Sequence, residues 1–208
     1  MARTNFQRAG FMYHSPKSGH EGMVTPRPCF IASGYNTADL YVGDPVSWVS
    51  DGSVIRTAAG SATAIYGVIS AILQFRNSDG VLVRNGRYIP SGTTWTADSD
   101  RSMVMVLPAA GAIFEVDADD GTSITTIAAA RSVAGENCDH VFGTADQGLA
   151  LSPSLLDIST HATTATLQWR VVDVLDQPSN DLTQTRGRYI VYANLLHNWA
   201  GLPVSLGV

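Results

Sequence analysis

The chain has 208 residues and a net charge of −5, and charged residues make up only 15% of it. An average globular domain carries about 25%, so such a surface is typical of a protein partly covered by neighbours. A neutral secreted or Ser/Thr-rich soluble protein is the alternative. The sequence has no basic stripe or block, which argues against direct nucleic-acid binding.

No apolar run reaches the ~18 residues of a membrane span, and the N-terminus lacks the apolar stretch of a signal peptide. We therefore expect no membrane partner and synthesis in a cytoplasm.

Residues 1–28 differ from the rest of the sequence. They hold three Gly and three Pro residues, and no helical or strand period lasts through them. We predict an extended N-terminal arm that has no core of its own and becomes ordered on assembly. A tail without a role is the alternative. Exposed aromatic and apolar side chains suit burial on a partner, and the candidate partner-binding residues in the arm are Phe6, Phe11, Met12 and Tyr13.

Residues 29–197 predict an all-β core domain, a β-barrel or sandwich of short antiparallel strands. Asp51-Gly52 stands between two apolar runs and predicts a hairpin turn. The expected strands are 30–33, 45–49, 54–57, 66–75, 87–89, 102–107, 113–117, 140–143, 166–175 and 188–194. At most two short helices are expected, at 123–133 and 154–156. Residues 198–208 form a C-terminal tail, in which Trp199 is a fifth candidate partner-binding residue.

Two cysteines, Cys29 and Cys138, stand far apart in the sequence. Such a pair makes neither a disulfide framework nor a metal motif. Both are predicted to be small buried or half-buried residues.

The run Cys138-Asp139-His140 could place the first and third side chains on one face of a strand. Two ligands do not complete a zinc site, and a Cys–His pair needs an orienting group and an oxyanion hole. We predict no catalytic, cofactor or metal residues here.

One acidic run resembles the start of a calcium-binding loop: Asp117, Asp119 and Asp120, followed by Gly121. A calcium loop of this type needs a glutamate at its twelfth position, where this chain has Ala128. The preferred interpretation is an acidic hairpin turn.

Ordered blocks covering most of the chain resemble the small β-rich head proteins of tailed bacteriophages, the capsid decoration or cement proteins. One block is Tyr41-Val42-Gly43-Asp44-Pro45-Val46, and the order and spacing of the blocks carry the resemblance. The blocks are 31–38, 41–46, 51–52 with 58–60, 66–69, 87–93, 112–119, 137–144, 148–152, 175–180 and 189–197.

The resemblance implies a non-enzymatic virion protein without cofactors. We expect it on the capsid surface, where it would decorate and stabilise the shell by clamping neighbouring subunits. The expected partners are the major capsid protein and further copies of this chain, as a homo-oligomer for which a trimer is favoured. Another virion component, such as a neck, tail or fibre-base protein, is the alternative, and a β-rich hydrolase is a third.

Overall fold

The structure is a computed structural model, and it describes residues 10–17, 24–33, 35, 37–93, 101–119, 124, 126–145, 147–175, 177, 180, 186–197 and 203–205. Antiparallel strands dominate the described residues, which contain one α-helix. The prediction of an all-β fold is therefore confirmed.

The first large sheet, sheet B, is built from residues 27–108 and has five strands in a row with a sixth at the side. The order is β2 (Arg27–Phe30), β9 (Met103–Pro108), β6 (Gly67–Arg76), β4 (Pro45–Trp48) and β5 (Val54–Arg56), and β7 (Leu82–Arg84) pairs with β6. A parallel bridge from Ile31 to Val54 joins the two outer strands. Beside sheet B lies the short pair β3 (Leu40–Tyr41) and β8 (Tyr88–Ile89).

The second large sheet, sheet A, has six strands and is built mainly from residues 112–193. The order is β1 (Met12–Pro16), β10 (Ala112–Asp117), β14 (Arg188–Ala193), β13 (Trp169–Val174), β11 (Asn137–Phe142) and β12 (Ser154–Ala162). A parallel bridge from Ala118 to Leu156 joins the ends of β10 and β12. Strand β1 therefore lies outside this closure, paired with β10.

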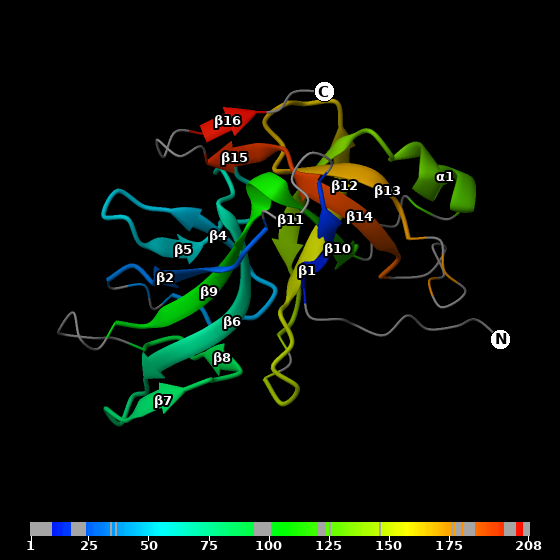
Figure 1. The fold of residues 1–208 in the computed structure, drawn as a ribbon. Coiled ribbons are helices and arrows are strands. Elements are labelled where there is room, and N and C mark those ends of the chain that lie inside the picture. The colour runs from blue at the N-terminus through cyan, green and yellow to red at the C-terminus, as the bar shows by residue number, and fades with distance from the viewer. Residues whose placement is uncertain are drawn as a thin grey trace.

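The two sheets stand side by side, with the strands of sheet B in blue to green and most of sheet A in green to orange (Figure 1). A 3₁₀ turn at Ala109–Gly111 links β9 to β10 and so leads from one sheet to the other. Strand β1 is the exception to the chain order, because it precedes sheet B but pairs within sheet A. The hairpin of β15 (Leu195–His197) and β16 (Pro203–Ser205) follows sheet A.

Hairpin turns hold sheet B together locally. Gly52 has a φ of 79° between β4 and β5, and Gly80 has a φ of 78° between β6 and β7. A left-handed backbone is cheap only for glycine, so these two residues let the paired strands turn sharply. The predicted hairpin at Asp51-Gly52 is confirmed.

Each sheet encloses a core of its own. The core of sheet B holds mostly aliphatic side chains: Cys29, Ile31, Leu40, Val46, Val54, Ile69, Ile72, Phe75, Ile89, Val104 and Val106. The core of sheet A is built round Phe11, Phe114, Trp169 and Tyr189. It also takes Val68 and Leu107 from strands of sheet B and Ile65 from the segment before β6, so the second core depends on the part of the chain that builds sheet B.

Helix α1 (Ile127–Ser132) lies inside the predicted helical range 123–133, so that prediction is confirmed. The hydroxyl of Thr126 accepts a hydrogen bond from the Ala129 N–H at 3.1 Å and caps the helix. The second helical prediction, 154–156, is wrong, since these residues begin strand β12. Their side chains are all buried, so tertiary packing decides the structure there.

Candidate functional site

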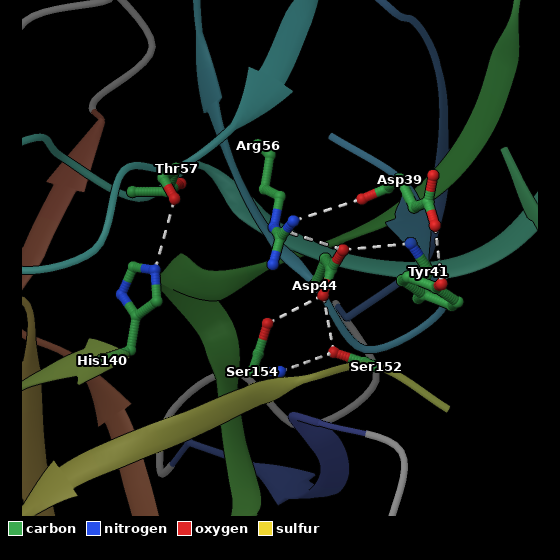
Figure 2. Close-up of polar contacts among 8 residues, drawn as sticks. All are labelled: Asp39, Tyr41, Asp44, Arg56, Thr57, His140, Ser152 and Ser154. Atoms are coloured by element: carbon green, nitrogen blue, oxygen red, sulfur yellow. Dashed lines mark hydrogen bonds and ion pairs between the residues drawn. The ribbon is translucent and has the colours of Figure 1, made fainter. Parts of the chain in front are cut away.

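A cluster of buried polar side chains lies at the junction between the two sheets. Asp44 lies in the turn between β3 and β4, directly after Gly43, which has a φ of 95°. Its carboxylate accepts hydrogen bonds from the Ser152 hydroxyl at 2.5 Å and the Ser154 hydroxyl at 2.7 Å. It also accepts one from the Tyr41 N–H at 3.0 Å. The carboxylate is fully buried and connects sheet B to strand β12 of sheet A (Figure 2).

Arg56, the last residue of β5, provides the opposite charge. Its Nε lies 3.5 Å from Asp44 Oδ2, and one terminal nitrogen donates to the Asp39 carbonyl at 3.2 Å. The guanidinium also stacks over the Phe142 ring, 3.4 Å from its centroid. Burial raises the pKa of Asp44, while Arg56 and the serine hydroxyls act in the opposite direction. Asp44 and Arg56 thus form a buried ion pair on the sheet B side of the junction, and Ser152, Ser154 and Phe142 contact it from the sheet A side.

His140 lies further along the same junction, on β11. Its Nε2 is 3.3 Å from the carbonyl oxygen of Thr57, which follows β5 (Figure 2). The ring packs edge-on against Phe142 and Phe11. Burial lowers the pKa of His140 to about 4, so the imidazole is neutral at pH 7.

The arrangement does not match the order of a nucleophilic triad. Such a site needs a histidine between the nucleophile and the carboxylate. Here the hydroxyls of Ser152 and Ser154 donate directly to Asp44, and the His140 Nε2 faces a backbone carbonyl. All four side chains are fully buried. Their geometry fits a structural role: Asp44, Ser152 and Ser154 form a buried joint that holds the two sheets together.

The other two members of the run on β11 are also buried. Cys138 belongs to the core of sheet A, and burial raises the pKa of its thiol well above the usual range. The Asp139 carboxylate accepts a hydrogen bond from the Gln168 N–H at 3.2 Å. Cys29 and Cys138 are both free and buried, which confirms the prediction for them.

The acidic run begins at the end of β10. Asp117 is the last residue of that strand, is 3% exposed and pairs with Arg188 at 3.1 Å, so it belongs to the expected strand 113–117 and not to an acidic hairpin turn. Asp119 accepts a hydrogen bond from the Ile158 N–H at 3.2 Å. Asp120 and Gly121 lie outside the described residues. Among the residues that the structure describes, no group of three potential ligands could hold a metal ion.

The predicted partner-binding residues fall into three groups. Phe11 is only 2% exposed and stacks on Trp169 at 4.1 Å between ring centroids, so the expectation of an exposed side chain is wrong for this residue. Met12 and Tyr13 are 37% and 48% exposed. Phe6 and Trp199 lie outside the described residues. Residues 10–17 of the predicted arm pack on sheet A as strand β1 and its flanks.

Further exposed apolar side chains lie on both sheets and around them. Sheet B contributes Phe30 on β2 and Leu82 on β7, and sheet A contributes Val172 on β13. The remaining ones are Val81, Ile127 and Leu149. The sequence does not indicate that these residues are exposed, because an isolated apolar residue in a β-rich chain carries no signal of exposure.

No sequence pattern indicates the joint itself. Asp44 stands within the block 41–46, and a polar residue in an apolar run is the one signal that it offers. Ser152 and Ser154 stand 108 and 110 residues away from it in the chain, and no local pattern connects residues at that separation.

Comparisons with family models, curated proteins and solved structures found no match for the chain. In the described residues, no helix has the length and apolar character needed to cross a membrane.

Proposed function

We propose that the protein is a non-enzymatic structural component of a tailed-bacteriophage particle. It binds the outer surface of the capsid in many copies, as a homo-oligomer for which a trimer is favoured. There it stabilises the shell by clamping neighbouring capsid subunits.

The observation that carries this proposal is the distribution of polar and apolar side chains. The candidate reactive residues on β11 are buried, and Asp139 and His140 hold neighbouring segments together. Exposed apolar residues, in contrast, lie on elements of both sheets, such as Tyr13 on β1 and Phe30 on β2. A rigid body with several separated apolar contacts suits multivalent attachment, in which each contact raises the effective concentration of the next.

The ordered sequence blocks support the same proposal. The block around Asp44 forms the buried joint, and the block 137–144 covers β11 with the first residues after it. The blocks thus include residues that fix the relative placement of the two sheets.

The first experiment measures copy number in purified particles with a quantitative protein gel. A decoration protein is expected in hundreds of copies, and a neck protein in about a dozen, by the symmetry of those assemblies. Hundreds of copies support the proposal. About a dozen copies favour another virion component, and absence from the particle overturns both interpretations.

The second experiment measures the stabilising effect by comparing DNA release on heating from particles with and without the protein. Loaded particles should release DNA at a higher temperature, and the gain should rise steeply with occupancy because several contacts act together. Moderate salt should leave the protein bound, since screening acts mainly on exposed ion pairs. Equal release temperatures would exclude the stabilising role.

A third experiment tests the arm. Deleting residues 2–9 keeps β1 and Phe11, which belong to the folded core. The truncated protein should remain folded and bind particles more weakly. Full binding by the truncated protein would show that this part of the arm has no role in attachment.

A further inference from the structure

His140 is held between groups from both halves of the chain. The segment 57–65, which runs from the end of β5 to the start of β6, lies against sheet A. The His140 ring faces the Thr57 carbonyl, and the His140 carbonyl accepts a hydrogen bond from the Gly60 N–H at 3.3 Å. The Ile65 N–H donates to the Leu195 carbonyl at 2.8 Å. His140 thus bonds to this segment through both its side chain and its backbone.

The hydrogen-bonding groups round the ring are acceptors. Gln168, the residue directly before β13, lies beside the His140 ring and favours the protonated form of the imidazole. The Gln168 amide nitrogen donates to the carbonyls of Ala58 and Thr63, which leaves its oxygen as the group available to the ring. Neither that oxygen nor His140 Nδ1 has a hydrogen-bond partner in the described residues. A neutral imidazole has one N–H and can donate to only one of Thr57 and Gln168, whereas an imidazolium could donate to both. Burial of the ring outweighs this gain, because the protonated ring loses its hydration in the closed junction.

The charges round the ring oppose protonation. Arg56 stacks on Phe142, which is itself in edge contact with His140, and its charge disfavours a second cation. Asp44 is engaged with Arg56 and two serine hydroxyls. Asp139, the neighbour on β11, accepts from the Gln168 backbone. Phe11 contributes only an apolar ring.

We propose that His140 is an acid-sensitive latch between the two sheets, and that its protonation releases segment 57–65 from sheet A. At neutral pH the ring stays neutral and the junction is closed. In acid the imidazolium is favoured where water can solvate it, which requires the segment to move away. The two cores remain folded during this step.

The direction of the pH effect follows from linkage. The pKa of His140 is lowered to about 4 in the closed junction, whereas an accessible histidine titrates near about 6.5. The open state therefore binds more protons between these two values. The closed state is fully favoured above about pH 6.5. It loses that advantage as the pH falls from there towards about 4, the pKa of His140 in the closed junction.

Amide hydrogen exchange on the full chain tests the latch between pH 7 and pH 4.5. The protection of the Gly60 and Ile65 amides should fall by up to about tenfold per pH unit below 6.5, the limit for one proton. Amides within the ladders of β9 and β14 should keep their protection. The variant His140→Gln should lose this pH dependence at the junction. The matched control His161→Gln should keep it, because His161 lies at the surface, where it pairs with Glu136 at 2.5 Å.

The ring titration of His140, followed by NMR in the unmodified protein, keeps the proposal testable if the variant fails to fold. Titration near pH 4 together with loss of junction protection supports the latch. Titration near pH 6.5 with unchanged junction amides overturns it. Unchanged pH dependence in His140→Gln, or a uniform loss of protection across both cores, also overturns it.

Discussion

The core of sheet B is filled mainly by aliphatic side chains from residues 29–106, whereas the core of sheet A is built round aromatic rings and draws on residues from Phe11 to Ala193. Sheet B is built from one stretch of the chain, residues 27–108, although it too includes a long-range pair, β2 with β9. Sheet A adds strand β1, which comes before all of sheet B in the sequence and pairs with β10 about a hundred residues later. The stability of sheet A should consequently be the more sensitive to contacts across the junction.

The first test of this difference between the sheets removes the negative charge of Asp44 at the joint. Asp44→Ala leaves the buried Arg56 and two serine hydroxyls without their partner. Loss of one member of a buried ion pair typically costs about 3–5 kcal/mol, so the free energy of unfolding in urea at pH 7 should fall by that amount.

Asp51→Ala is the matched control for Asp44→Ala. Asp51 lies in the exposed turn between β4 and β5 and bonds only locally, to Ser53. Its replacement should change stability far less. Equal effects of the two variants would show that the joint does not connect the sheets energetically.

The second test compares the stability lost by substituting Phe11 with that lost by substituting the nearby Tyr13. Phe11→Ala removes a ring that stacks on Trp169 in the core of sheet A, and truncation of a buried Phe costs about 3 kcal/mol or more. Tyr13→Ala, two residues further on, removes a side chain that is 48% exposed and should cost about 0.5 kcal/mol or less. Thermal unfolding followed by circular dichroism measures both.

Particle binding by the same two variants distinguishes packing from attachment. Tyr13→Ala should bind more weakly although it is stably folded, since its side chain is available to a partner. A large loss of stability in Tyr13→Ala, with full binding, would contradict both parts of this expectation.

The third test concerns space at the junction. Gly10 has a φ of 65°, and a Cβ there would collide with the Ser152 hydroxyl and the Gly43 carbonyl oxygen. Gly10→Ala should therefore cost about 2–3 kcal/mol, from overpacking and backbone strain together. Gly60 has a similar φ of 59° with open space around it, so Gly60→Ala should cost about 1 kcal/mol from strain alone. Equal costs would mean that the N-terminal strand does not pack closely on the junction.

Sequence-based prediction succeeded where a local signal is strong, in both sheets: the ends of β10 and β14 in sheet A were also predicted to within one residue. The strands of the hairpin at Asp51-Gly52 were predicted within one residue at each end, because alternating apolar residues flank a strong turn signal. The long strand β6 and the strand β9 were equally accessible from their β-branched and apolar runs.

Two of the missed strands, β1 and β12, depend on distant partners, whereas the missed strand β7 pairs locally with β6. Strand β1 has the sequence MYHSP and pairs with β10 about a hundred residues later. Strand β12 begins with buried residues whose pattern was interpreted as helical, and its hydroxyls meet Asp44 only in the folded state. Neither signal is present within a short window of sequence.

The mildest of the expected effects on the two cores come from the cysteines, one in each core. Cys138 is fully buried in the core of sheet A, and Cys29 is 5% exposed on β2, an outer strand of sheet B. Replacement by Ala removes one sulfur from packing, so we expect a loss of about 2 kcal/mol for Cys138→Ala and about 1 kcal/mol for Cys29→Ala.

The rates of thiol labelling at Cys29 and Cys138 compare the two sheets without any substitution. Burial raises the pKa of both thiols and lowers the amount of reactive thiolate. In the folded protein, a disulfide reagent should modify Cys29 first, through local opening of the outer strand β2. Cys138 should react only at the rate of global unfolding, because sheet A must come apart to expose it. Mass spectrometry of the labelled peptides assigns the order. Faster labelling of Cys138 would mean that sheet A opens more readily than sheet B, and that its long-range contacts are weaker than its aromatic packing indicates.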